Sequence, residues 1–371
     1  MGDTNFTKQG FSQHLAEHKL MGTECTVCGT QHLPPRPLCP NCFSNELRWV
    51  EMNPRGTLAA FTTVHIASSA MIEAGYGREN PHCSGIVQLE NGQSISALIL
   101  GVDVSDPTSI EIVQIYYELH GPENAPVLVL NNGIIMNAAT SWGFQTKTLS
   151  SVYRVLQYDC RGQGQSDHPV KPYTMEQHAE DLSKLLDALE IEKAHIAGIS
   201  YGGEVAQAFA LAFPEKTLSL ILADTVSEVG PELRLIIESW EDALRADDPL
   251  AFFNATVPWN FSVEFIANNA SLLEDAKQRY PLLDFPAVIR LCEAFYQVNF
   301  TARLQEINAP TCIICGEKDQ LKGLPYARIL KQHIPHAELH ILKGAGHASC
   351  WERPAEFNTV VLGFLAKVPP G

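Results

Sequence analysis

Hydrophobic and polar positions follow two different patterns along the chain. From about residue 112, short apolar runs are separated by longer segments in which apolar residues recur at helical spacing. Short apolar runs are typical of strands buried in a parallel sheet, and helices are the usual connections between such strands. We expect a doubly wound α/β sheet with helices on both faces. Its seven candidate strands are Ile112 to Leu119, Pro126 to Leu130, Arg154 to Tyr158, Lys193 to Ile199, Leu218 to Ala223, Thr311 to Cys315 and Glu338 to Leu342.

One helix between these strands has a clear start. Thr174 and Gln177 have the spacing of a capping box, in which two side chains satisfy the first free backbone amides of a helix. The residues that follow place leucines on a single helical face, at Leu182, Leu185, Leu186 and Leu189. This spacing predicts an amphipathic helix that packs against the sheet.

The first 110 residues have a different pattern. Phe11 to Leu20 is predicted to form a short helix, and from Gly56 to Asp103 short strands replace helices. The candidate strands are Thr57 to His65, Ser84 to Leu89 and Gln93 to Leu100, with a turn at Glu90 to Gly92. Several short strands joined by tight turns indicate a small β-barrel.

The composition of the chain limits the classes of protein to which it can belong. A chain of 371 residues with 45% hydrophobic content suggests about two domains with sizeable cores. Acidic residues exceed Lys and Arg by 16, and they are in excess in the first 110 residues too, which argues against nucleic-acid binding. No segment has the length and apolar content of a membrane span, and the N-terminus lacks the features of a signal peptide. We therefore expect a cytoplasmic protein with reduced cysteines and no membrane partner.

Four of the ten cysteines form two C-x-x-C pairs, separated by ten residues: Cys25, Cys28, Cys39 and Cys42. Each pair can direct two thiolates at one tetrahedral ion, so the spacing predicts one structural zinc ion. A closed set of four sulfurs has no open position for a substrate, which makes a catalytic metal improbable. A rubredoxin-like iron would accept the same ligands and stays open as an alternative.

Ser200 has the sequence context of a catalytic nucleophile. It lies in Gly198-Ile-Ser-Tyr-Gly202, between a predicted strand and a predicted helix. A nucleophile elbow needs a sharp turn that side chains do not crowd, and the two glycines leave that space. The amide of Tyr201 falls at the helix start, where an unpaired donor can stabilise an oxyanion.

A serine nucleophile needs a base and an acid that orients the base. Asp319 follows the strand Thr311 to Cys315, and His347 follows the last strand in the glycine-rich Leu342-Lys-Gly-Ala-Gly-His347. The order serine, acid, histidine is the one expected of an α/β-hydrolase. Asp224 and Glu317 are rival candidates for the acid, whereas His195 and His120 are predicted to be structural.

The oxyanion requires a second backbone donor near the end of an early strand. Asn131, Asn132, Gly133 and Ile134 follow the strand Pro126 to Leu130. We expect the amide of Ile134 to act beside that of Tyr201, and Asn132 is a candidate for a further side-chain contact.

Other residues are candidates for core and pocket positions. Cys312 and Cys315 should face opposite sides of their strand, and Cys160 and Cys350 are predicted to be reduced structural thiols. One group of aromatic residues could line an apolar pocket, although most of them should be core: Trp142, Trp240, Trp259, Phe252, Phe253 and Phe295.

Residues 11 to 108 resemble the zinc-ribbon plus OB-fold family often called DUF35, through "FSQHLAEHKL", "PPRPLCPNC", "RGTLAAFTTVH" and "GVDVSDPTS". The resemblance implies a docking role toward a thiolase-like or acyltransferase partner, in an acyl-CoA context. The family pattern requires a final barrel strand after Gly101 to Asp103, where this chain leaves little room for one.

Residues 112 to 368 resemble the α/β-hydrolase superfamily, through "VLVLNNGI", "QYDCRGQGQSD", "AGISYGGEVA", "CIICGEKD" and "GAGHASCWERPAEF". This resemblance implies an eight-stranded sheet with a helical cap at about 226–308, including helices at Leu272 to Arg279 and Phe285 to Phe295. The stretch Asp159 to Asp167 is interpreted as a structural loop. The family usually has His-Gly-x where this chain has Asn132, Gly133 and Ile134.

We therefore expect an N-terminal helix and zinc ribbon at 1–50, an OB-like β-barrel at 51–110, and an α/β-hydrolase domain at 111–371. The predicted function is serine hydrolysis of an ester, an acyl thioester, an enol lactone or a β-dicarbonyl compound. Two alternatives stay open. In one, the first domain is a scaffold for a condensing enzyme and the hydrolase edits its products as a thioesterase; in the other, the fold performs cofactor-free lyase or oxygenase chemistry.

Overall fold

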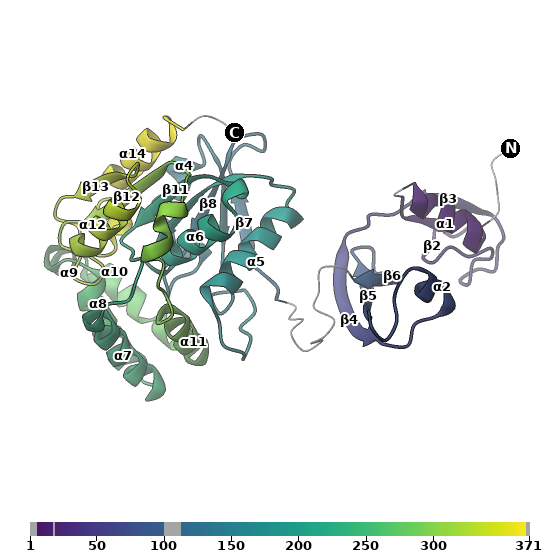
Figure 1. Cartoon of the computed structure of the whole chain (residues 1–371), viewed down its shortest axis with the longest axis horizontal. Helices are drawn as coiled ribbons and strands as arrows, with labels where there is room; N and C mark the ends of the chain where they lie inside the picture. Colours follow the sequence, from purple (N-terminus) through teal and green to yellow (C-terminus); the bar gives the residue numbers. More distant parts are fainter. Residues whose placement is uncertain (1–5, 18, 100–112, 369–371) are drawn as a thin grey trace. The chain divides into compact units, whose positions relative to one another are not determined.

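The computed structural model describes residues 6–17, 19–99 and 113–368 (Figure 1). The chain divides into two compact units, residues 1–112 and residues 113–371. The domain boundary expected near residue 110 lies outside the described residues, as does the expected end of the barrel.

The first unit begins with helix α1, Lys8–Ala16, followed by a three-stranded antiparallel sheet of order β2-β1-β3. The helix was predicted at Phe11 to Leu20 and starts and ends earlier. Thr7 accounts for the earlier start, because its side chain accepts a hydrogen bond from the amide of Gly10 and so acts as the N-cap. The strands are β1 (Met21–Cys25), β2 (Gln31–His32) and β3 (Leu47–Glu51).

A second antiparallel sheet in this unit has the order β4-β5-β6. Its strands are β4 (Gly56–Val64), β5 (His82–Leu89) and β6 (Ser94–Ile99), which confirms the three strands predicted here to within two residues. Helix α2, Ser69–Glu73, lies between β4 and β5 in the chain. Gly92 has φ +80° and closes the predicted turn, a backbone conformation that favours glycine.

The second unit contains a seven-stranded sheet of order β13-β12-β11-β10-β8-β9-β7 (Figure 1). All neighbouring strands are parallel except β7, which pairs antiparallel with β9. Six predicted strands are confirmed to within one residue at each end. The strands are β7 (Tyr117–His120), β8 (Val127–Asn131), β9 (Arg154–Tyr158), β10 (Ala194–Ile199), β11 (Thr217–Ala223), β12 (Thr311–Gly316) and β13 (Glu338–Leu342).

The first predicted strand of this sheet was wrong in its length, because β7 begins only at Tyr117. The backbone amides of Gln114 and Tyr116 donate to the side chains of Asp167 and Ser166 instead of to a neighbouring strand. Among the described residues the sheet has seven strands, whereas the resemblance implied eight.

Helices pack on both faces of this sheet. Helices α5 (Met175–Ala188), α6 (Tyr201–Ala212) and α12 (Leu324–His333) contribute to the core on one face. Helices α4 (Thr146–Leu149) and α14 (Pro354–Leu365) contribute to the core on the other. The doubly wound α/β architecture predicted from the hydrophobic pattern is therefore confirmed.

Two local predictions for this unit are also confirmed. The capping box at the start of α5 is formed, because Thr174 accepts from the amide of Gln177 and Gln177 accepts from the amide of Thr174. Cys312 and Cys315 belong to the cores on opposite faces of the sheet, as the alternation along a strand requires.

A helical insertion connects β11 to β12. It contains α7 (Pro231–Arg245), α8 (Pro249–Asn260), α9 (Val263–Asn268), α10 (Ala270–Lys277) and α11 (Phe285–Phe295). Helix α11 has the predicted bounds, and α10 starts and ends two residues before its prediction. The helices α8, α9 and α11 each begin with a side-chain N-cap, from Asp248, Ser262 and Asp284. Two short helices, α3 (Ala138–Ser141) and α13 (Ser349–Glu352), complete the loops around the sheet edge.

No helix within the described ranges is long and apolar enough to span a bilayer.

Candidate active site and metal site

Ser200 lies on a sharp turn between β10 and α6. Its backbone has φ +54° and ψ −121°, a conformation that non-glycine residues rarely adopt. A Cβ atom on Gly198 would lie 2.0 Å from the carbonyl oxygen of Gly202, and one on Gly202 would lie 2.2 Å from that of Asn131. Both positions therefore require glycine, and the turn raises Ser200 at the carboxyl edge of the sheet.

The side chains of Ser200, His347 and Asp319 form one hydrogen-bonded chain. Nε2 of His347 lies 2.9 Å from Oγ of Ser200, and Nδ1 of His347 lies 2.9 Å from Oδ2 of Asp319. All three residues are buried. The imidazole therefore contacts the hydroxyl with one nitrogen and the carboxylate with the other, although 147 residues separate the serine from the histidine.

Backbone amides hold the carboxylate of Asp319 in place. Its second oxygen, Oδ1, accepts from the amide of Leu321 at 2.8 Å and from the amide of Lys322 at 2.9 Å. These two bonds fix the orientation of the carboxylate, so that its other oxygen, Oδ2, faces Nδ1 of His347.

The rival acids have other partners. Asp224 accepts from the amide of Gly316 at 2.8 Å and from the hydroxyl of Ser349, and burial raises the pKa of Asp224 well above its usual value. Glu317 accepts from the amide of Gly344 at 2.8 Å. Both acids are among the described residues, and neither has a hydrogen bond to His347 there. Asp224 instead connects Gly316, the last residue of β12, to Ser349, which follows His347 by two residues.

Two histidines predicted to be structural have hydrogen bonds away from Ser200. His195 lies on β10 with its Nδ1 2.8 Å from Oγ of Ser219, and burial lowers the pKa of His195 to about 4. His120 lies 2.9 Å from Oε2 of Glu118.

The two residues whose amides are the predicted oxyanion donors lie after the C-terminal end of β8 and at the N-terminal end of α6. Ile134 follows β8 by three residues, and Tyr201 is the first residue of α6. Both residues line a small pocket together with Ser200. Because the Cβ position of Gly202 would meet the carbonyl oxygens of Asn131 and Asn132, the loop after β8 packs directly against the start of α6.

A cavity of about 390 Å³ opens beside Ser200 and His347. Of the aromatic residues proposed from sequence, Trp240 lines this cavity, whereas Trp142, Phe252 and Phe295 are buried in the core. The prediction missed the other aromatic lining residues, Phe261, Tyr280 and Trp351, which come from the helical insertion and from α13. No local motif marks them, because their exposure to the cavity depends on how the insertion folds over the sheet.

Two polar residues that line the cavity, His168 and Asp284, contact each other. Nδ1 of His168, in the loop after β9, lies 2.8 Å from Oδ2 of Asp284, which also caps α11. Both residues line the cavity. The pair therefore ties the helical insertion to a loop of the sheet next to the candidate site.

The thiols predicted to be structural are free and buried. Burial raises the pKa of Cys160 to about 12 and that of Cys350 well above its usual value. Both side chains are thus neutral thiols at neutral pH and are poor nucleophiles.

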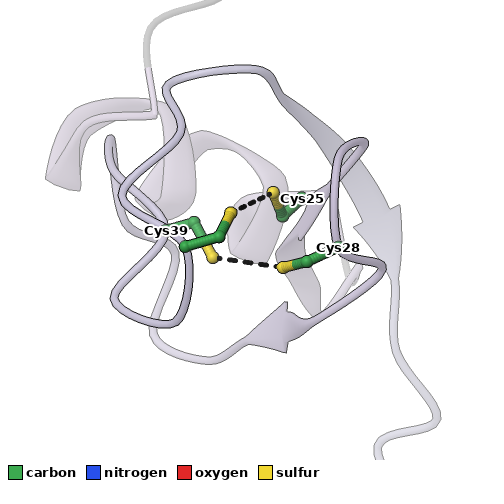
Figure 2. Close-up of side chains that lie close together, drawn as sticks. Cys25, Cys28 and Cys39 are labelled. Atoms are coloured by element: carbon green, nitrogen blue, oxygen red, sulfur yellow. Dashed lines mark hydrogen bonds between the residues drawn. The ribbon is translucent and has the colours of Figure 1, made fainter.

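The predicted cysteine site is assembled in the first unit. The four sulfur atoms of Cys25, Cys28, Cys39 and Cys42 all lie within 4.8 Å of one another. In Figure 2 the labelled side chains of Cys25, Cys28 and Cys39 are directed toward a common centre, Cys25 from the end of β1. The Cys25 and Cys42 sulfurs are 3.5 Å apart, and those of Cys28 and Cys39 are 3.6 Å apart.

These separations fit a tetrahedral metal. Four sulfurs at about 2.3 Å from one zinc ion would be about 3.8 Å from one another. Each C-x-x-C turn closes in the same way: the amide of Gly29 donates to the carbonyl of Cys25, and the amide of Phe43 donates to the carbonyl of Cys39, both at 2.8 Å. Gly29 and Phe43 both have positive φ. The two turns thus form a matched pair that can hold zinc.

Three family matches cover the two units. Residues 126–354 match the family described as the alpha/beta hydrolase fold. Residues 12–48 match the "ChsH2, rubredoxin-like zinc ribbon domain", and residues 49–113 match the "ChsH2, C-terminal OB-fold domain". Both resemblances drawn from the sequence are confirmed by these matches.

Similar proteins cover the second unit. The 3-oxoadipate enol-lactonase 1 of Acinetobacter baylyi is 31% identical over 256 residues, which cover 68% of this chain and 92% of the relative. The crystal structure of MGS-M2, an alpha/beta hydrolase from a Medee basin deep-sea metagenome library, has a TM-score of 0.66 at 32% identity and covers 71% of this chain and 98% of its own. The enol-lactonase from Burkholderia xenovorans has a TM-score of 0.65 at 29% identity, over 69% and 97% of the two chains.

Proposed function

The chain belongs to the alpha/beta hydrolase fold family, and from this premise we propose that it is a serine hydrolase in which Ser200, His347 and Asp319 carry the reaction. The hydrolase relatives support action on a carbonyl substrate. The observation that carries the proposal is the pair of 2.9 Å contacts from His347, one to Oγ of Ser200 and one to Oδ2 of Asp319.

In the proposed mechanism, Oγ of Ser200 attacks the substrate carbonyl carbon while its proton passes to Nε2 of His347. Asp319 holds the imidazole in the required tautomer and stabilises the imidazolium that forms. The carbonyl oxygen becomes an oxyanion that accepts hydrogen bonds from the amides of Ile134 and Tyr201. The oxyanion then collapses, the bond to the leaving group breaks, and His347 returns its proton to the leaving group.

Water completes the cycle. It attacks the acyl carbon and gives a proton to His347. The bond from that carbon to Oγ of Ser200 then breaks, and His347 returns the proton to Oγ, which releases the acid and restores the serine hydroxyl. The strained backbone of Ser200 supports this role, because strain of this kind persists where the surrounding structure holds a reactive side chain in place. Nothing in the mechanism needs the cysteine site of the first unit.

The proposed substrates are esters, acyl thioesters, enol lactones and β-dicarbonyl compounds. Two relatives are named as enol-lactonases, which makes an enol lactone the first substrate class to test. The many apolar residues along the cavity, Trp240, Phe261 and Val288 among them, suit a substrate with a hydrophobic portion.

The test combines a substrate screen with a change at the nucleophile. The purified full-length protein is assayed with enol lactones, p-nitrophenyl esters, acyl-CoAs and 1,3-diketones, before and after treatment with a serine-directed phosphonate. We expect turnover of at least one class, its loss after treatment, and a covalent adduct at Ser200 by mass spectrometry. Ser200→Ala should lose nearly all turnover while its melting temperature stays close to that of the wild type. Full activity of this variant would exclude the mechanism.

For the first unit, we propose that the four cysteines bind one zinc ion and that residues 1–110 dock a thiolase-like or acyltransferase protein. The ChsH2-type matches support this role. A purified thiolase of the same cell, mixed with the full-length protein, should elute with it in size-exclusion chromatography. Separate elution at micromolar concentration would contradict the docking role and would leave the hydrolase proposal intact.

A further inference from the structure

Gln163 is a buried polar residue whose role the sequence did not reveal. It lies in the loop after β9, within the stretch Asp159 to Asp167 that was interpreted as structural, and it is only 3% exposed. Its Nε2 atom donates to the carbonyl oxygen of Gly133 at 2.9 Å and to that of Ile134 at 3.1 Å. A side-chain amide carries two N–H donors, so both are used on this one segment.

The first of these bonds acts on the peptide unit that contains the amide of Ile134. The carbonyl of Gly133 and the N–H of Ile134 belong to the same peptide, which is not among the cis peptides of the described residues. In a trans peptide the two groups point in opposite directions. A hydrogen bond that fixes the Gly133 carbonyl therefore also fixes the direction of the Ile134 N–H.

The second bond fixes the next peptide unit, which begins with the carbonyl of Ile134. Gln163 thus holds the peptide planes on both sides of Ile134. This support matters because glycine at position 133 leaves the backbone free to rotate, and the other hydrogen bonds there are longer. The amide of Met136 donates to the Gly133 carbonyl at 3.1 Å, and the Gly133 amide lies 3.4 Å from Oγ of Ser141. We propose that Gln163 is a positioning residue that aims the Ile134 amide at the oxyanion formed at Ser200.

The backbone of Gln163 is itself held in place. Its backbone amide donates to the carbonyl of Cys160 at 2.9 Å, and its backbone carbonyl accepts from the amide of Ser166 at 3.1 Å. The two neighbouring residues are glycines of positive φ. Asp159 makes a parallel connection between the same two loops, because its carboxylate accepts from the amides of Ala138 at 2.6 Å and Gln165 at 2.8 Å. The loop after β9 is therefore hydrogen-bonded to the segment after β8 through two side chains, those of Gln163 and Asp159.

This inference rests on the proposed serine hydrolase function, and its test separates the two. Gln163→Met keeps the volume of the side chain and removes both donors, and Gln163→Glu replaces the donors with oxygens that repel the two carbonyls. Gln207→Met is the matched control, because Nε2 of Gln207 also donates to two backbone carbonyls in a buried position, those of Gly203 and Val226.

With a p-nitrophenyl ester, kcat of Gln163→Met should fall about 10- to 100-fold, somewhat less than the loss of a whole oxyanion donor. KM should stay near the wild-type value, because the contact strengthens only in the transition state. The affinity for a boronic acid or a trifluoromethyl ketone, which form a tetrahedral adduct with Ser200, should fall by a similar factor. Gln163→Glu should lose more activity than Gln163→Met.

Gln207→Met should lose comparable stability in urea denaturation and keep its kcat. If Gln163→Met has the wild-type kcat, or loses kcat only in proportion to the Gln207→Met control, the positioning role is wrong even though Ser200→Ala is inactive. An active Ser200→Ala would instead overturn the proposed function. If Gln163→Glu does not fold, Gln163→Met together with the adduct affinities decides the question.

Discussion

Lys322 and Glu204 form a fully buried ion pair directly behind the candidate site. Nζ of Lys322 lies 3.0 Å from each carboxylate oxygen of Glu204, and the two side chains are 4% and 0% exposed. The ammonium group also lies 4.3 Å from the centre of the Phe295 ring. Burial lowers the pKa of Lys322, and the charge of Glu204 opposes that shift. The pair connects α6, which begins next to Ser200, to the segment after Asp319.

Because the two charges are buried together, removal of one partner should lower the free energy of unfolding more than removal of both. Lys322→Met leaves the carboxylate of Glu204 buried without a counterion, and we expect a loss of about 3–5 kcal/mol in the free energy of unfolding. In the double variant Lys322→Met with Glu204→Gln, the amide oxygen can still accept from the amide of Val226, as the carboxylate does now at 3.0 Å. The double variant should therefore be more stable than Lys322→Met alone. Urea denaturation of the four proteins of this cycle tests the coupling, and purely additive losses would contradict it.

Asp319→Asn tests the identity of the acid. The amide oxygen can still accept from the amides of Leu321 and Lys322, but an amide nitrogen facing Nδ1 of His347 favours the wrong tautomer of the imidazole. We expect kcat to fall about 10³- to 10⁴-fold with the fold retained. Glu317→Gln, which changes an acid two residues earlier in the same loop, should leave kcat unchanged. The opposite ranking in an ester assay would assign the role of the acid to Glu317.

The three candidate catalytic residues could be predicted because each follows the end of a strand. In a parallel sheet these ends lie at one edge, so Ser200, Asp319 and His347 could be placed together from strand pattern and order alone. The acid was harder to choose, because Asp224 also follows a strand. Only the structure shows that its two oxygens contact Gly316 and Ser349.

The roles of Gln163 and Lys322 could not be predicted from the sequence. Each depends on a contact between segments far apart in the chain, 30 residues for Gln163 with Gly133 and 118 for Lys322 with Glu204. Glutamine and lysine are most often exposed residues, so nothing in the local pattern marks them as buried. By contrast, the start of α1 at Lys8 could have been predicted from the sequence, because Thr7 is a standard N-cap residue.

The buried His195 predicts a loss of stability in acid. Its pKa is lowered to about 4 by burial, below the value of about 6.5 for an unfolded chain. Below pH 6.5 the unfolded chain binds the proton more readily, so the contribution of His195 to stability is complete above that pH and is lost as the pH falls toward 4. The shift corresponds to about 3 kcal/mol.

His195→Gln should therefore reduce the dependence of stability on pH between 4 and 6.5. Urea denaturation at a series of pH values measures the slopes for both proteins. The buried His178, whose pKa is lowered to about 3, remains in both and contributes a slope of the same sign. Equal slopes for wild type and His195→Gln would show that His195 is protonated with little cost in the folded protein.

Removal of one cysteine ligand should separate the metal site from hydrolysis. Cys25→Ser leaves three sulfurs, and because structural zinc sites contribute directly to folding, we expect the variant to lose its metal and the ordered ribbon around β1. None of the four ligands lies within residues 113–371, so hydrolysis of a p-nitrophenyl ester should persist. Cys83→Ser is the control, because Cys83 is buried in the same unit but does not belong to the cysteine cluster. Elemental analysis should find one zinc ion per chain in the wild type and in this control. A Cys25→Ser protein that retains its full metal content would contradict the four-sulfur site, and iron in place of zinc would identify it as a rubredoxin-like centre.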